Sequence, residues 1–76
     1  MLKIKDNVDL KELEKYGFEP EYEYLLPNVL MGYSKHSIRI WNDRSITKRD
    51  AHFGEIDIDI LYDLIKDGLV EKVEDK

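Results

Sequence analysis

The sequence predicts an α+β fold in which two helices lie on one face of a small, mainly antiparallel sheet. Two amphipathic segments end in the same pattern of apolar, basic and glycine residues, Leu10-x-x-Leu13-x-Lys15-x-Gly17 and Leu61-x-x-Leu64-x-Lys66-x-Gly68. This pattern is typical of a helix that ends at a left-handed glycine. The segments around these helices alternate polar and apolar residues, as strands do. With 76 residues, we expect residues 1–76 to form a single compact domain.

The first part of the chain predicts a strand, a helix and a second strand. Residues 2–5 alternate apolar and basic side chains, as a short edge strand does. In the helix that follows, Asp9 caps the N-terminus, the Glu12 side chain bonds back to that cap, and Gly17 follows the last turn. Residues 18–26 place aromatic and apolar side chains on one side and glutamates on the other, which indicates a half-buried strand.

The rest of the chain predicts three more strands, a second helix and a final strand. Residues 29–34, 37–41 and 45–48 are the strand segments, with a tight turn at 42–44. Residues 49–54 show no pattern. Asp57 then caps a helix that ends before Gly68, and residues 69–73 return as a strand. The expected order is β-α-β-β-β-β-α-β.

The inward positions of these elements predict the hydrophobic core. It consists of Leu10, Leu13, Phe18, Tyr22, Ile38, Ile40, Ile46, Leu61, Leu64, Ile65 and Val70.

Charge is unevenly distributed along a chain whose formal net charge is −5. Residues 1–34 carry four lysines against seven acids, and residues 53–76 carry three lysines against eight acids. Residues 35–52 instead carry five Lys or Arg against two acids. The central hairpin at 35–49 is therefore expected to differ in charge from the rest of the surface.

This central hairpin is the predicted partner-binding surface. Arg39 and Trp41 share a strand face, Arg44 lies in the turn, and Lys48 follows on the next strand. A basic hairpin with one aromatic side chain can stack on and neutralise a nucleic acid. The alternative is that Trp41 covers the core while the cations neutralise acidic neighbours, and the negative net charge favours this alternative.

The sequence offers little catalytic chemistry. Without cysteine, disulfides and thiolate metal sites are excluded, and a cytoplasmic location is expected. His36 and His52 are the only histidines, and no serine or threonine lies in a nucleophile-elbow pattern. The closest approach to a metal cluster is His52-x-x-Glu55-x-Asp57-x-Asp59, which lacks the glycine and terminal glutamate of a calcium loop. We therefore expect no enzyme activity, no metal and no cofactor.

Membrane association is not expected either. The N-terminus has no apolar stretch of the kind found in signal peptides, and no run of apolar residues is long enough to span a bilayer.

Both ends of the chain resemble those of small uncharacterised proteins encoded by phages and prophages of low-GC bacteria. The resemblance is carried by Leu2-Lys3-Ile4-Lys5-Asp6-Asn7-Val8-Asp9-Leu10 and by Tyr62-Asp63-Leu64-Ile65-Lys66-Asp67-Gly68-Leu69-Val70-Glu71-Lys72-Val73. It implies a biological context and no site residues. The expected function is that of a non-catalytic phage or prophage accessory protein that binds a macromolecular partner, with a protein as the first choice. The alternatives are a nucleic-acid-binding module that uses the hairpin 35–49 and, as a third class, a small enzyme.

Overall fold

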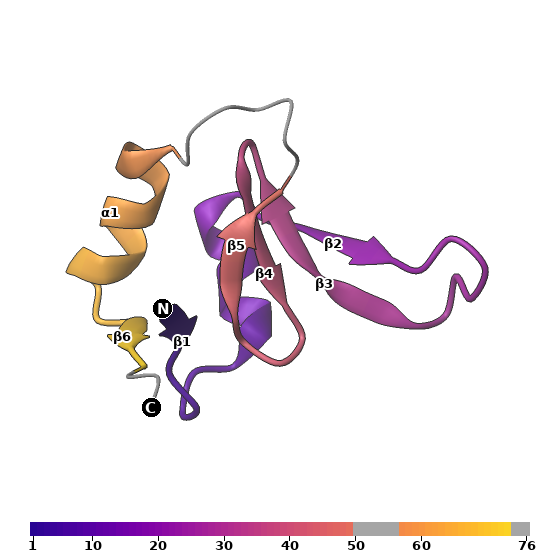
Figure 1. Ribbon diagram of the computed structural model, residues 1–76, viewed down its shortest axis with the longest axis horizontal. Coiled ribbons are helices and arrows are strands. Elements are labelled where there is room, and N and C mark those ends of the chain that lie inside the picture. Colours follow the sequence, from indigo (N-terminus) through magenta and orange to yellow (C-terminus); the bar gives the residue numbers. More distant parts are fainter. Residues whose placement is uncertain (50–56, 74–76) are drawn as a thin grey trace.

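The computed structural model describes residues 1–49 and 57–73. Eight elements follow one another in these ranges (Figure 1). They are β1 (Leu2–Ile4), the 3-10 helix η1 (Leu10–Tyr16), β2 (Glu19–Tyr22), β3 (Leu30–Lys35), β4 (Ile38–Trp41), β5 (Ile46–Lys48), α1 (Ile58–Lys66) and β6 (Val70–Lys72). The predicted α+β class is confirmed, and the expected order of elements agrees roughly, with a 3-10 helix in place of the first α-helix. Most of the unpatterned segment 49–54 lies outside the described residues.

The strands form two antiparallel sheets where the sequence predicts one. Four strands make a meander in the order β2-β3-β4-β5, and the two terminal strands β1 and β6 pair with each other. An isolated bridge from Lys3 to Ser45 links the two sheets, and the Ile4 amide donates to the Arg44 carbonyl at 2.9 Å. The terminal strands lie side by side in Figure 1, because β6 returns to the N-terminal strand.

Each helix contacts a different sheet. The helix η1 contacts β2 of the four-stranded sheet, and α1 contacts β6 of the two-stranded sheet. The two predicted helices are therefore present, but they lie against two sheets and not on one face of a single sheet. The Tyr16 hydroxyl donates to the Asp67 carboxylate at 2.6 Å and connects the ends of the two helices.

The first helix is a 3-10 helix, where an α-helix was expected. Its apolar residues Leu10, Leu13 and Tyr16 recur every three positions, and a 3-10 helix with three residues per turn aligns them in one row. Asp9 caps it as predicted, accepting from the Lys11 amide at 3.0 Å. The predicted capping box is wrong, because the Glu12 carboxylate binds the Lys15 ammonium at 2.9 Å.

Both helices end as the repeated pattern predicts. Gly17 has φ +87° and Gly68 has φ +80°, so both are left-handed. The amide of Phe18 donates to the Leu13 carbonyl at 3.2 Å, and that of Leu69 donates to the Leu64 carbonyl at 3.0 Å. These bonds define a Schellman motif at each helix end. Both apolar residues that follow the glycines are buried.

Replacing Gly68 with alanine is expected to cost about 1 kcal/mol of stability. A Cβ at this position would meet nothing within 4 Å, so the cost comes from the positive φ alone. Urea denaturation of wild type and variant measures it. An unchanged midpoint would show that the left-handed conformation contributes nothing.

The core lies between the helices and the inner faces of the sheets. Of the predicted core residues, Leu13, Phe18, Ile38, Ile40, Ile46 and Leu64 are buried, and Leu10, Leu61 and Val70 are half-buried. Tyr22 and Ile65 were wrongly assigned to it, since 53% and 48% of their surface is exposed. Ile4, Tyr33 and Leu69 complete the core, although the sequence did not single them out.

Candidate functional site

The hairpin residues predicted to bind a partner do not gather on one face. The β4–β5 register places Arg39 opposite Thr47, and Ile38 opposite Lys48. Directly opposed residues share a face of the sheet, and neighbouring residues of a strand point to opposite faces. Lys48 therefore belongs to the face of the buried Ile38, and Arg39 belongs to the other face.

Arg39 and Trp41 do form a pair on the outer face of the sheet. The Arg39 guanidinium carbon lies 5.1 Å from the centroid of the Trp41 ring, which is cation-π distance. Its Nη2 atom is 3.1 Å from Glu21 Oε2, and the Trp41 indole N–H donates to Thr47 Oγ1 at 2.8 Å. Trp41 is half-buried, and both side chains already have partners within the chain.

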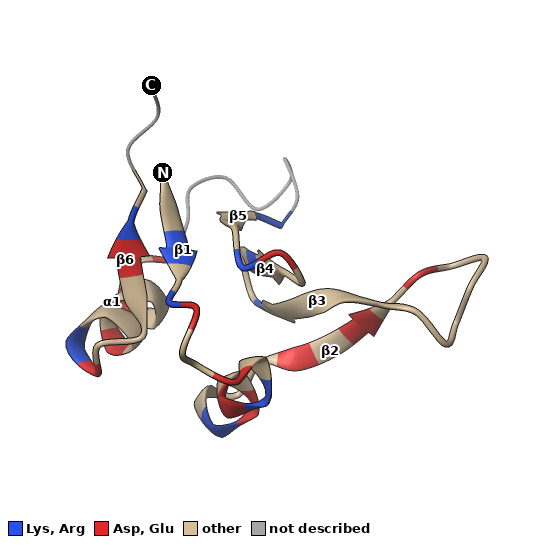
Figure 2. Cartoon of the chain, turned by 90° about the horizontal axis from the view of Figure 1, so that it is seen from below, with Lys and Arg blue, Asp and Glu red and all other residues tan. Residues whose placement is uncertain are grey.

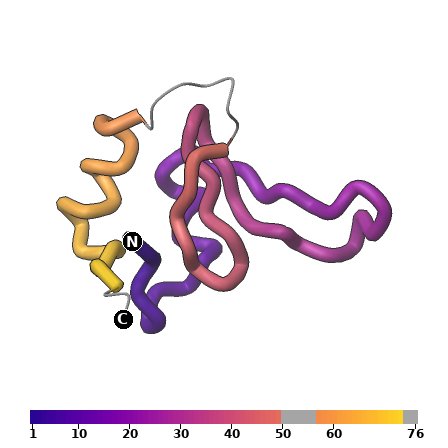
Figure 3. The backbone as a smooth tube through the Cα atoms, viewed as in Figure 1, coloured from indigo at the N-terminus to yellow at the C-terminus, as the bar shows by residue number. Residues whose placement is uncertain are grey.

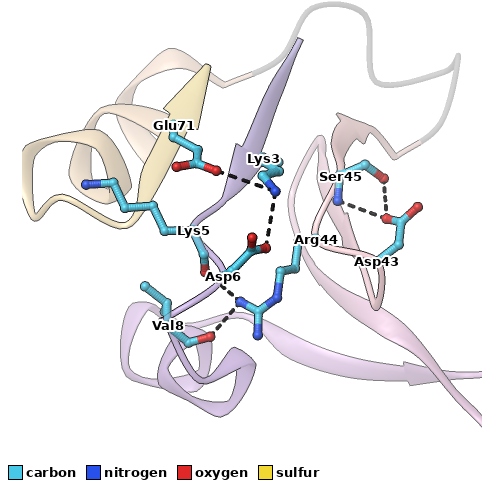
Figure 4. A network of polar contacts seen from close by, with 8 residues as sticks. All are labelled: Lys3, Lys5, Asp6, Val8, Asp43, Arg44, Ser45 and Glu71. Atoms are coloured by element: carbon cyan, nitrogen blue, oxygen red, sulfur yellow. Dashed lines mark hydrogen bonds and ion pairs between the residues drawn. The ribbon is translucent and has the colours of Figure 1, made fainter. Parts of the chain in front are cut away.

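Arg44 connects the β4–β5 turn to the segment that follows β1 (Figure 4). Its Nη1 donates to the carbonyl oxygens of Lys5, at 2.7 Å, and Val8, at 2.6 Å. Its backbone is left-handed, with φ +80°. Next to it, Asp43 accepts from the Ser45 hydroxyl and amide, and these bonds lower the pKa of its carboxyl. The Arg44 side chain thus holds the fold together, in a turn where the sequence suggested an exposed cation.

Glu21 is the acidic centre of the outer face. Burial raises its pKa, but the hydrogen bond from the Ser34 hydroxyl and the charges of Arg39 and Arg49 lower it by more. The net result is a pKa below the ordinary glutamate value. The Arg49 Nε atom lies 3.6 Å from Glu21 Oε1.

The lowered pKa of Glu21 predicts a specific loss of stability in acid. Ionised Glu21 stabilises the fold above the ordinary glutamate pKa of about 4.3, and this contribution is lost as the pH falls through the lower folded pKa. Glu21→Gln should therefore lose less stability than wild type on acidification from about pH 5. Thermal unfolding across this range measures the difference, and Glu19→Gln on the same strand is the control. Identical pH profiles for Glu21→Gln and wild type would contradict it.

A second feature is the projecting loop 23–29 between β2 and β3, which we call the arm. Figures 1 and 3 show it extending away from both helices. The exposed fractions of Tyr24 and Leu25 are 96% and 84%, and Leu26 and Val29 are also exposed. The arm is nevertheless closed by backbone hydrogen bonds, from Glu23 N to Val29 O at 3.0 Å and from Val29 N to Leu26 O at 2.8 Å.

The sequence prediction missed the arm because it extended the strand of residues 18–26 too far. The observed strand β2 ends at Tyr22, where the pairing register with β3 shifts. Beyond this point no helix or strand of residues 1–49 and 57–73 covers the apolar side chains. One signal was present in the sequence, since Leu25, Leu26 and Pro27 interrupt the alternation of polar and apolar residues.

The outer side of α1 carries a smaller apolar stripe. Ile58, Tyr62 and Ile65 follow the spacing of one helix face and are 69%, 59% and 48% exposed. The buried side of the helix carries Leu64. The stripe is bordered by acidic residues such as Asp59 and Asp63.

The described surface contains few features of a catalytic or metal site. A hollow of about 320 Å³ is lined by Gly17, Glu19, Ser34, Lys35, His36 and Arg49. Its Lys35 ammonium donates to the Tyr16 carbonyl at 2.6 Å. Within residues 1–49 and 57–73 no three His, Asp or Glu side chains are placed to hold a metal ion. His52 and Glu55 of the suggested cluster lie outside the described residues.

Neither helix of the described ranges has the length and apolar character required to cross a membrane. Comparison with known proteins gives no match to a family model, to a curated protein or to a solved structure.

Proposed function

We propose that this chain is a non-catalytic, cytoplasmic protein that binds a protein partner, and that the arm is the contact surface. The observation that carries the proposal is the group of exposed apolar side chains on an ordered projection: Tyr24, Leu25, Leu26 and Val29. Contiguous exposed apolar surface is typical of interaction sites. A role as a phage or prophage accessory protein is part of the same proposal and is supported only by the sequence resemblance.

The arm is a better candidate than the hairpin because its exposed apolar side chains are not held by other side chains in the part of the chain that the structure describes. Arg39 would have to leave Glu21, and Arg44 would have to leave two carbonyl oxygens, before either could bind a partner. The aromatic and aliphatic side chains of the arm are already exposed to solvent. A tyrosine beside leucines can also bury a large area in a complementary cleft.

Removing the apolar side chains of the arm should abolish partner capture. We expect the double variant Leu25→Ser, Leu26→Ser to fold normally, because both residues are exposed and lie outside the strands. Immobilised wild-type protein and this variant would be compared for proteins retained from a lysate of the source cells, with quantification by mass spectrometry. A partner retained by wild type should be depleted by at least about tenfold with the variant.

The matched control is Ile58→Ser, Ile65→Ser, which removes two exposed apolar side chains from α1. This control should retain the partner. If the control loses the partner while the arm variant retains it, the arm is not the contact surface. A salt-sensitive shift of DNA or RNA by the wild-type protein would instead support the hairpin alternative.

A further inference from the structure

The arm and the strand leading into it carry charge of one sign. Between residues 16 and 34 the chain has three glutamates and no lysine, arginine or histidine. In Figure 2 the ribbon of β2 and the beginning of the arm carries red segments separated by tan ones, and no blue segment lies among them. A partner that covers the exposed apolar side chains of the arm therefore also faces this negative charge.

Two of these three glutamates are free to meet a partner. Glu21 is paired with Arg39 and Arg49. Glu19 is exposed and Glu23 is half-buried, and neither forms an ion pair within residues 1–49 and 57–73. Glu23 lies at the beginning of the arm and places unpaired negative charge next to its apolar side chains. Glu19 lies at the other end of β2, opposite Ser34, and lines a hollow there together with Lys35 and Arg49.

We infer that the partner is a protein whose binding surface is an apolar patch bordered by lysine or arginine side chains. This inference rests on the proposed function and adds the chemistry of the partner. Burial of the arm tip requires apolar surface, and opposite charges at the rim steer and orient the approach. The negative charge of Glu23 repels phosphate groups within a Debye length of about 8 Å, which disfavours nucleic acid and anionic lipid as occupants of the arm.

Two synthetic probes test this chemistry on the intact chain. Both are amphipathic peptides of about 18 residues, or five helical turns, with the same leucine face. One carries lysines on its polar face and the other carries glutamates. Binding is measured by fluorescence anisotropy of the labelled peptide at an ionic strength of about 0.15 M. The lysine peptide is expected to bind about tenfold or more tightly than the glutamate peptide.

Charge reversal on the arm should remove this preference. Glu23→Lys is expected to weaken binding of the lysine peptide about threefold to fivefold and to strengthen binding of the glutamate peptide. The control Glu14→Lys changes the net charge by the same amount at an exposed position outside the arm. It should keep most of the affinity for the lysine peptide.

The outcomes separate this inference from the proposed function. No binding of the lysine peptide, equal binding of both peptides, or an equal loss in the control variant would overturn the inferred partner chemistry. Tighter binding of single-stranded DNA or of anionic vesicles than of the lysine peptide would overturn it too, if Leu25→Ser, Leu26→Ser abolished that binding. Loss of lysate capture in the apolar variant would still support the arm as a contact surface in each of these cases.

Discussion

Replacing Leu64 with alanine is expected to lower the free energy of unfolding by about 2 to 5 kcal/mol. Leu64 is completely buried and is the one fully enclosed side chain of α1. The substitution removes its apolar contacts and leaves a cavity between the helix and the sheets. Domains of this size have a stability of about 4 to 11 kcal/mol, so the loss would be a large share of the total.

Chemical denaturation in urea measures this loss, and the next residue of the helix supplies the control. Ile65 is 48% exposed, so Ile65→Ala should cost much less than Leu64→Ala. Similar costs for the two substitutions would mean that the helix is rotated from the orientation described above.

Replacing Gly32 with alanine is expected to destabilise the protein by about 3 kcal/mol or more. A Cβ on Gly32 would lie 2.2 Å from the Ile40 carbonyl oxygen and 2.8 Å from the Trp41 Cα. Both atoms belong to the backbone of β4, which pairs with β3 at this point. Strands β3 and β4 would have to move apart, which disturbs the centre of the four-stranded sheet.

The comparison with Gly68→Ala isolates the steric contact. Both glycines have a positive φ, +80° at Gly68 and +158° at Gly32, but the Cβ position of Gly68 is open, whereas at Gly32 the added carbon would collide with backbone. Denaturation midpoints of the two variants should therefore differ, with Gly32→Ala the less stable. A smaller effect at Gly32 would show that the sheet tolerates the added carbon.

The hairpin surface and the arm differ in whether their side chains already make contacts within the protein. On the outer face, Arg39 is bound by Glu21 and Trp41 by Thr47, while Arg39 Nε is buried without a hydrogen-bond partner among the described residues. Binding of a partner to these side chains requires exchange of existing contacts. The arm needs no such exchange. The hairpin surface of Arg39, Trp41, Arg44 and Lys48 stays a prediction, and the capture and salt titration experiments distinguish it from the arm.

The sequence alone determined the features that depend on neighbours along the chain. Asp57 caps α1, and Gly17 and Gly68 end the two helices, because these roles are filled by hydrogen bonds within a few residues. Alternation of apolar residues located the central strands and the buried Ile38 and Ile40 for the same reason. These local patterns were sufficient for the α+β class.

Tertiary structure decided the features that depend on residues far apart. Arg44 looked like an exposed turn cation, yet it binds two carbonyls near residue 5, more than thirty positions away. The cross-strand register placed Lys48 and Arg39 on opposite faces of the sheet. The exposure of Tyr24 and Leu25 arises because no other element of the described part of the chain packs over the arm, and the pattern of neighbouring residues contains no information on that packing.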